Sequence, residues 1–548
     1  MNARSVVRSR PEAMNCDPSN ALERQVAELF VVRSSGYLND QQRRYPQWEL
    51  SNAEIRSLLE RGVGGVILLG GSAVELQQRT LQLQGWSDQQ LLFCADVEEG
   101  VGQRFEGASW LVPPLALGRL HQKQPQKALE LAERYGRCTA DQARRCGLNW
   151  VLGPVCDVNN NPANPVINVR AWGEDPATAG ALAAAFQRGL SRGGVLGCAK
   201  HFPGHGDTAS DSHLDLPLLP HDRKRLNQIE LPPFRDVIAA GVDSVMTAHL
   251  LLPQLDPNRP ATLSSAVLGD LLRKELGFDG LVVTDALVME AITARHGAAE
   301  AAVLAFEAGA DLILMPADAD AAIQGLCQAI DQGRIPIDRL HTALHRRRQA
   351  LARLDAHASH QEQPLPTRAE RTLEQELVAA SLELRPAQGI PSSTGINLIR
   401  VDGVWPCPAL SGAAPALRRP ESSGYRPVVV HSQGVSPWQD DPEAPLAMDR
   451  LGDGPVLLQL FLRGNPFRGD RDRQEPWRAA VQQLQHNQRL IGLIVYGSPY
   501  QWDELRDVLE PSIAAAYSPG QMPEAQKQVL TALLRDCSTI HSAGDFTD

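Results

Sequence analysis

Seven side chains that can carry or accept protons fall within one short segment, residues 200–217. They are Lys200, His201, His205, Asp207, Asp211, His213 and Asp215. Pro203, Gly204 and Gly206 oppose regular structure there, so we expect the segment to be a loop. An apolar run at 195–199 precedes it and predicts a buried strand. A loop of this content leaving a rigid strand is a candidate active site.

Two features of the sequence suit acid/base and nucleophilic chemistry. His213 lies two residues after Asp211, and an Asp that holds an imidazole fixes its tautomer and raises its pKa. Asp285 ends another apolar run, 281–284, where a carboxylate could attack an anomeric carbon. Two simpler interpretations stay open, because Asp285 could cap the next helix and His213 could be a solvated loop residue.

The same segment fits two other chemistries. Lys200 at a strand end could form a Schiff base. His201, His205, Asp207 and His213 could hold a metal ion. The sequence has no HExxH motif or other tight set of ligands, so we expect neither a metal nor a cofactor.

Apolar runs and helical stretches alternate eight times between residues 26 and 332, beginning with a strand expected at 26–32. Short apolar strands joined by helices predict an α/β fold with a parallel sheet buried on both faces. Eight units in about 300 residues suit a (β/α)8 barrel of the TIM type, with an open doubly wound sheet as the alternative. The active site of such a barrel lies at the carboxyl ends of its strands. Polar residues stand at the expected strand ends: Asp96, Asp157, Lys200, His201, His249 and Asp285.

Changes in composition divide the chain of 548 residues. We expect a disordered leader at 1–20, a catalytic barrel at 21–354 and a linker rich in His, Gln and Pro at 355–370. A smaller α/β domain should follow at 371–548, and we find no cluster of catalytic residue types in it. Its strands are expected at 396–401, 427–430, 456–461 and 490–495.

Bulk composition excludes several classes of partner. The formal net charge of −11 argues against nucleic acid and anionic membranes. No apolar run approaches the roughly 20 residues that a membrane-spanning helix needs. The nine cysteines form no CxxC pair, which favours reduced, buried thiols and a cytoplasmic protein.

The loop and the Asp285 strand together resemble family 3 glycoside hydrolases, and most closely their bacterial β-N-acetylglucosaminidase (β-hexosaminidase) branch. The loop contributes KHFPGHG at 200–206 and DSH at 211–213. Three further stretches agree in the expected order: GGVILL at 64–69, ADVEEG at 95–100 followed by QRF at 103–105, and VRAWGEDP at 169–176.

The resemblance implies a role for each matching residue. Asp285 would be the nucleophile, and His213 the general acid/base with Asp211 as its partner. The sugar-binding residues would be Asp96, Arg104, Arg170, Lys200 and His201. One position departs from the family, because Glu99 stands where a Gly is usual, and we expect its side chain to narrow or charge the mouth of the site.

These features lead to one functional hypothesis. It is an exo-acting, retaining β-N-acetylhexosaminidase that removes terminal N-acetylglucosamine, from peptidoglycan fragments in cell-wall recycling, by double displacement. Its partner would be a small carbohydrate, with no nucleic acid or membrane involved. The oligomeric state and the natural aglycone stay open. The alternatives are a β-glucosidase, a phosphorylase on the same scaffold, a non-catalytic sugar-binding protein and a metal-dependent hydrolase.

Overall fold

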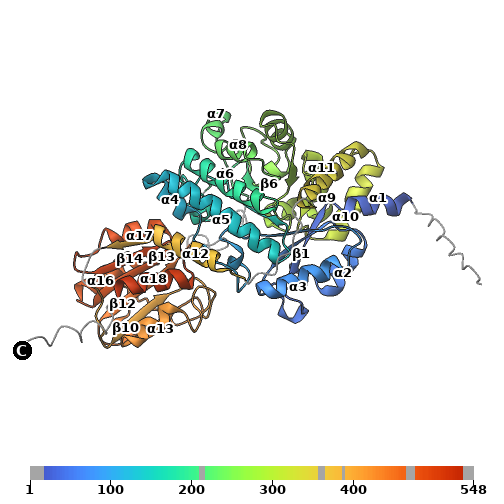
Figure 1. Ribbon diagram of the computed structural model, residues 1–548. Helices are drawn as coiled ribbons and strands as arrows, with labels where there is room; N and C mark the ends of the chain where they lie inside the picture. Colours follow the sequence, from blue (N-terminus) through green and yellow to red (C-terminus); the bar gives the residue numbers. More distant parts are fainter. Residues whose placement is uncertain (1–17, 209–215, 356–364, 386–388, 464–474, 535–548) are drawn as a thin grey trace, which may run out of the picture.

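The structure is a computed structural model, and it describes residues 18–208, 216–355, 365–385, 389–463 and 475–534. Asp211, His213 and Asp215 therefore lie outside the described residues, as do most of the expected leader and linker. In Figure 1 the N-terminal part runs from blue to olive, and the C-terminal part, in orange and red, lies beside it.

The described N-terminal part contains eight strands in two parallel sheets. One sheet has the order β4-β3-β2-β1-β8 and the other the order β5-β6-β7. Single bridges join their edges, Trp150 to Leu196 and Val283 to Leu312. The strands are β1 (Phe30–Ser35), β2 (Gly65–Leu69), β3 (Leu92–Ala95), β4 (Trp150–Val151), β5 (Cys198–Phe202), β6 (Ser244–Thr247), β7 (Leu281–Val283) and β8 (Ile313–Leu314).

Helices connect these strands, and local sequence signals set their ends. α2 (Asn52–Glu60) begins with a capping box, in which the side chains of Ser51 and Glu54 each accept a backbone N–H of the other residue. α6 (Pro176–Gly193) begins with Asp175 as N-cap and ends at Gly194, whose φ of 72° suits glycine. The others are α1 (Pro18–Ala27), α3 (Ala73–Gln84), α4 (Leu115–Lys123), α5 (Pro125–Arg145), α7 (Arg223–Gln228), α8 (Pro232–Ala239), a π-helix (Ala266–Glu275), α9 (Glu290–Ala308), α10 (Ala319–Asp331) and α11 (Ile337–Asp355).

α5 and α6 pack against each other at backbone distance. A Cβ at Gly136 would lie 2.1 Å from the carbonyl oxygen of Phe186, and a Cβ at Gly189 would lie 2.2 Å from that of Glu133. Both positions therefore require glycine, because any side chain would push the helices apart.

Two strands lie later in the chain than the sequence predicts. β1 begins at Phe30, because the apolar residues Val26 and Ala27 end α1 instead. β5 covers 198–202 where 195–199 was expected, so Lys200 and His201 belong to the strand and the prediction that the loop begins at residue 200 is wrong. Phe202 pairs with Thr247 of β6, Lys200 bridges to Val155, and all five residues are buried. These contacts outweigh the local turn signals, which act only from Pro203 onward.

The C-terminal part is a sheet of order β11-β10-β12-β13-β14-β9, with β9 antiparallel to β14. The four predicted strands are present as β10 (Gly395–Arg400), β11 (Tyr425–Val430), β12 (Val456–Leu462) and β13 (Leu490–Gly497). β9 (Glu383–Arg385) and β14 (Ala514–Ser518) were not predicted. The helices are α12 (Arg368–Ser381), α13 (Pro415–Ser422), α14 (Met448–Leu451), α16 (Trp477–His486), α17 (Pro499–Arg506) and α18 (Pro523–Leu533).

Alternate strand residues of this second sheet enter two apolar clusters. Leu398 packs in the cluster that contains Trp477 and Trp502, whereas its neighbour Ile399 packs in the cluster that contains Leu417 and Val529.

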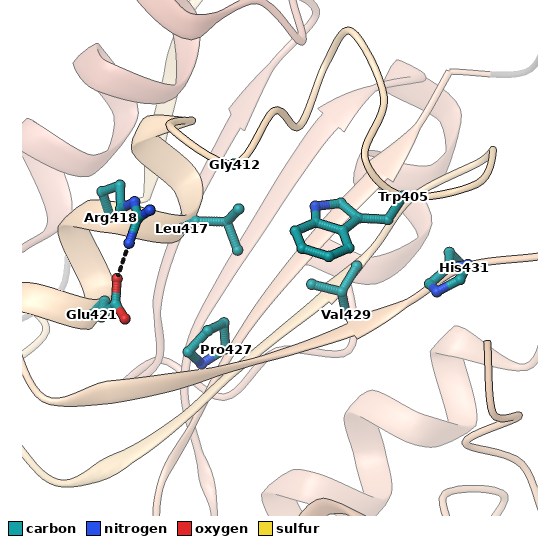
Figure 2. A pocket seen from close by; sticks show the side chains of 8 residues that line it. All are labelled: Trp405, Gly412, Leu417, Arg418, Glu421, Pro427, Val429 and His431. Carbon is teal, nitrogen blue, oxygen red and sulfur yellow. Dashed lines mark hydrogen bonds and ion pairs between the residues drawn. The ribbon is translucent and has the colours of Figure 1, made fainter.

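A cavity of about 490 Å³ lies between α13 and β11, lined in part by Trp405, Leu417 and Val429 (Figure 2). Among the described residues, no helix combines the length and apolarity needed to cross a membrane.

Candidate active site at the carboxyl ends of the strands

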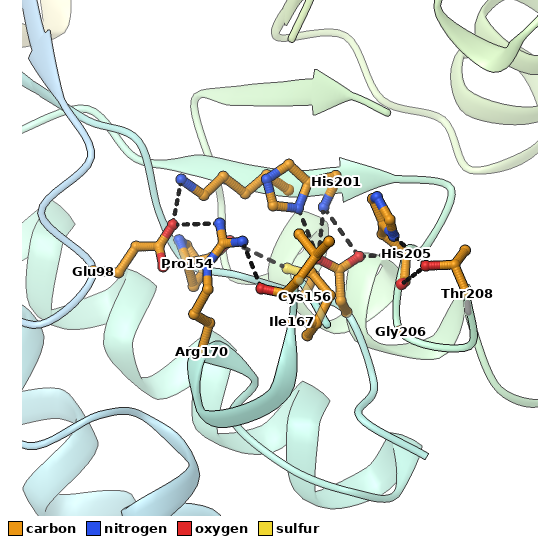
Figure 3. Close-up of polar contacts among 12 residues, drawn as sticks. Glu98, Pro154, Cys156, Ile167, Arg170, His201, His205, Gly206 and Thr208 are labelled. Atoms are coloured by element: carbon orange, nitrogen blue, oxygen red, sulfur yellow. Dashed lines mark hydrogen bonds and ion pairs between the residues drawn. The ribbon is translucent and has the colours of Figure 1, made fainter. Parts of the chain in front are cut away.

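Lys200, on β5, is the centre of a buried charge cluster. Its Nζ lies 2.7 Å from Asp96 Oδ1 and 2.7 Å from Glu98 Oε1, both in the segment that follows β3. Arg170 donates two hydrogen bonds of 2.8 Å to Glu98, from Nε to Oε2 and from Nη2 to Oε1 (Figure 3). The cluster therefore joins two cations to two carboxylates from three separate segments of the chain.

The partners in this cluster keep one another charged. Burial alone would raise the pKa of Glu98, but Arg170 and Lys200 lower it well below its usual value. Burial alone would lower the pKa of Lys200, but Asp96 and Glu98 raise it above its usual value. A lysine that stays protonated is a poor nucleophile, so the Schiff-base alternative loses its support.

Asp157, which is fully buried, holds two histidines in place. Its Oδ2 lies 2.7 Å from His201 Nδ1, and its Oδ1 accepts the backbone N–H of His205 at 2.7 Å. His201 thus keeps Nε2 as the ring nitrogen that a ligand can meet. His205 Nδ1 lies 2.7 Å from Thr208 Oγ1, and burial lowers the pKa of His205 to about 4, so its ring is neutral at neutral pH.

Asp285 follows the end of β7, and its partly exposed carboxylate accepts the N–H of Ala286 at 2.7 Å through Oδ1. β5, β6 and β7 are parallel neighbours, so Asp285 stands at the same edge of the sheet as Lys200 and His201. His249, beyond β6, supports this turn, because its Nε2 lies 3.2 Å from the carbonyl oxygen of Ala286. Asp285 does not cap α9, since that helix begins at Glu290.

The structure therefore brings together most of the predicted sugar-binding residues. Asp96 and Arg170 flank Lys200 and Glu98 in one network, and His201 adjoins Lys200 on β5. Arg104 is exposed and donates from Nε to the carbonyl oxygen of Asp96 at 3.0 Å. The predicted acid/base pair, Asp211 and His213, lies outside the described residues.

Sequence reasoning missed two of the residues that organise this site. The sequence places Asp157 at a strand end and Glu98 within the segment 95–100, but it indicates no function for either. One property of the sequence could have indicated them. Lys and Arg are seldom fully buried unless they are paired, so a Lys in an apolar strand predicts carboxylate partners nearby. Lys200, with a side chain 1% exposed, needs such carboxylates.

The metal site suggested by the sequence does not form among the described residues. His201 binds Asp157 and His205 contacts Thr208, whereas Asp207 lies 2.9 Å from His221 Nε2. Asp207, His221 and Glu230 approach one another closely enough for a metal ion. That place already has a cation, because the Arg225 guanidinium lies 3.1 Å from Asp207 and 3.3 Å from Glu230.

Glu99 does not lie where we expected it. Its side chain is 2% exposed and pairs with Arg463 of the second domain, while its Oε2 accepts the indole N–H of Trp110 at 2.8 Å. The expectation that Glu99 narrows or charges the mouth is therefore wrong. The cavity of the second domain is no better candidate for catalysis, because its lining carboxylate Glu421 pairs with Arg418 at 3.0 Å.

Two family models match this chain. The Glycosyl hydrolase family 3 N terminal domain matches residues 21–349, and the Bacterial Glycosyl hydrolase family 3 C-terminal domain matches residues 390–535. Both models therefore describe one family, and together they include every described residue of the charge cluster.

Curated proteins and solved structures agree with these matches. A Beta-hexosaminidase of Chromobacterium violaceum is 38% identical over 287 residues, which span 50% of this chain and 79% of that protein. A Beta-hexosaminidase of Neisseria meningitidis serogroup C is 36% identical over 276 residues, 49% of this chain and 75% of that protein. A glycoside hydrolase family 3 beta-N-acetylglucosaminidase from Paenibacillus sp. FPU-7 has a TM-score of 0.75 at 28% identity, covering 94% of this chain and 97% of that one.

Proposed function

This chain belongs to glycosyl hydrolase family 3 and is a glycosidase, and on that premise we propose that it is an exo-acting, retaining β-N-acetylhexosaminidase. It removes terminal N-acetylglucosamine by double displacement, with peptidoglycan fragments as the source of the sugar. Beta-hexosaminidases at 36–38% identity support the substrate class. A cytoplasmic location fits the seven described cysteines, which are free and mostly buried.

The observation that carries this proposal is the Lys200 cluster. Asp96 is 39% exposed whereas Lys200 is 1% exposed, so the carboxylate is the member of that pair that can bond directly to a ligand. A charged acceptor next to a fixed histidine, His201, suits the hydroxyl groups of one sugar ring. The same arrangement orients that sugar toward Asp285 at the neighbouring strand ends.

Each residue then has a defined step in the proposed reaction. The carboxylate of Asp285 bonds to the anomeric carbon as the bond to the leaving oxygen breaks, and His213 gives that oxygen its proton. His213 next takes a proton from water, which attacks the same carbon and frees Asp285. Asp211 holds the imidazole in the required tautomer. In this proposal the two N-terminal sheets act as one closed eight-stranded barrel, and the bridges between their edges support that arrangement.

The test compares aryl N-acetyl-β-glucosaminide with aryl β-glucoside, each with and without phosphate. We expect faster release of the aryl group from the first substrate and no dependence on phosphate. Asp285→Ala should lower turnover on the order of 10⁴-fold, as loss of a single catalytic carboxylate can do. Asp270→Ala is the control, because Asp270 is 66% exposed and pairs with Lys274 on a helix surface.

Three outcomes would change the proposal. Preference for the glucoside would replace the substrate, and a requirement for phosphate would replace hydrolysis with phosphorolysis. Equal turnover by Asp285→Ala and Asp270→Ala would remove the nucleophile from the mechanism.

A further inference from the structure

The second domain meets the first through residues that follow its strands. Tyr500, on α17, donates its hydroxyl to Glu174 Oε1 at 2.7 Å and accepts from Asn159 Nδ2 at 2.7 Å. Three residues further on, Asp503 pairs with Arg119 at 3.1 Å. The carboxyl edge of the second sheet thus faces the loops of the catalytic domain.

The strand order of the second sheet reverses between β10 and β12. In open parallel sheets this place commonly binds ligands, because the loops after the two strands diverge there. Here it contains charged side chains instead. Arg400 is buried and pairs with Asp402 and, at 2.7 Å, with Glu475. Arg463, just after β12, donates its backbone N–H to Asp402 Oδ2 at 3.3 Å.

Arg463 extends from this place to the catalytic domain. Its Nη2 pairs with Glu99 Oε1, and the two side chains are 13% and 2% exposed, so little water screens the pair. The other carboxylate oxygen of Glu99 accepts from Trp110 at 2.8 Å, and its backbone N–H donates to Gln103 at 3.0 Å. Glu99 is therefore held from both domains.

Glu99 is the direct neighbour of Glu98, whose carboxylate holds Lys200 and Arg170. The two side chains thus fix segment 96–100 through contacts with different domains. A displacement of Glu99 would be transmitted along the backbone to Glu98 and Asp96. The partly exposed carboxylate of Asp96 is the group that the proposed function assigns to sugar binding.

We propose that Arg463 is a positioning residue of the active site: through Glu99 it sets the position of segment 96–100, and with it the sugar-binding group Asp96. The second domain is then part of the apparatus that binds the sugar. This inference rests on the proposed function, because it assumes that the Asp96 cluster binds the substrate.

The test uses the full chain and four variants, Arg463→Gln, Arg463→Lys, Glu99→Gln and the double variant Glu99→Gln with Arg463→Gln. Arg418→Gln is the control, because it breaks an exposed ion pair of the same domain, with Glu421. For each protein, kcat and KM for the aryl N-acetyl-β-glucosaminide, the dissociation constant of N-acetylglucosamine by calorimetry and the urea midpoint are measured.

We expect Arg463→Gln to raise KM and the dissociation constant about tenfold with little change in kcat, a usual size for coupling between contacting residues. Arg463→Lys should recover part of that loss, since it keeps the charge but not the guanidinium fork. The double variant should regain urea resistance, because neither charge is left buried alone, yet keep the raised KM. Arg418→Gln should match the wild type.

Two results would overturn the inference. One is a KM and a dissociation constant within about twofold of wild type in Arg463→Gln. The other is a double variant that recovers both urea resistance and KM, which would make the pair merely structural. If the wild type hydrolyses no aryl glycoside, the proposed function fails, whereas the calorimetric ratios still decide the role of Arg463.

Discussion

Removing the charge of Glu98 should destabilise the N-terminal domain more than removing the charge of Asp96. Glu98 is 5% exposed and neutralises both Lys200 and Arg170, which are themselves 1% and 12% exposed. Loss of one partner from a buried ion pair costs about 3–5 kcal/mol. Asp96 still binds Lys200 in this variant, and a Gln side chain keeps one acceptor oxygen. We therefore expect Glu98→Gln to lower the free energy of unfolding by about 3 kcal/mol, the lower end of that range. Asp96 is 39% exposed, so Asp96→Asn should change the free energy of unfolding by about 1 kcal/mol or less.

For sugar binding we expect the reverse order, with the larger loss in Asp96→Asn. Asp96 presents the exposed carboxylate, and a hydrogen bond to a charged group contributes about 1.5–3 kcal/mol. Asp96→Asn should therefore lower kcat/KM roughly 10–100-fold while the fold is kept. Urea unfolding followed by tryptophan fluorescence measures stability, since Trp150 and Trp172 are buried in this domain. The ratio kcat/KM for the aryl substrate measures the effect on the site.

The dependence of stability on pH tests whether the charge of Glu98 causes this difference. The pKa of Glu98 is depressed in the folded protein, so its contribution to stability is complete above the unfolded value of about 4.5. Below about 4.5 that contribution is lost progressively, until pH has fallen through the lower folded value. The difference between wild type and Glu98→Gln should thus persist from pH 7 to pH 5. A difference below about 1 kcal/mol at pH 7, or an equal loss in Asp96→Asn, would refute this account of the cluster.

Two further predictions concern other parts of the chain. His213→Ala should slow hydrolysis of a poor leaving group far more than that of a good one, because protonation of the leaving oxygen matters less for a good one. Equal losses on a pair of aryl substrates would argue against the acid/base assignment. Burial and the neighbouring Glu524 raise the pKa of Glu374 to about 7, so this residue makes the fold less stable as pH rises from about 4.5 through 7. Glu374→Gln should therefore raise the free energy of unfolding by about 1 kcal/mol at pH 8 and leave it unchanged at pH 4, in urea titrations at both values; no gain at pH 8 would contradict this.

Local sequence patterns predicted the order of the elements well. The apolar runs at 65–69, 91–95 and 244–248 indicate strands, and the structure has β2, β3 and β6 there, within one residue of those bounds. Ser51 followed three residues later by Glu54 is the sequence pattern of a capping box, and α2 begins there. β14 was missed because its sequence, AAAYS, has little β-propensity, and pairing with β13 determines its conformation instead.

The partners within the site could not be predicted in the same way. Glu98 and Arg170 are 72 residues apart, and Glu99 and Arg463 are 364 residues apart. No spacing rule joins such positions, since the contact depends on how separate strands and domains meet. The residue types indicated which side chains could take part in the site. Which of Glu98 and Glu99 pairs with Lys200 depends on the direction in which each side chain leaves the backbone, and the sequence does not give that direction.

The glycine contact between α5 and α6 limits how this enzyme can be redesigned. Since Gly136 and Gly189 leave no room for a methyl group, the two helices cannot slide or separate without losing their packing. Attempts to broaden specificity should therefore leave the α5–α6 contact unchanged and vary the connecting segments at the carboxyl ends of the strands. A library directed at those segments would retain far more folded members than one that includes either helix face.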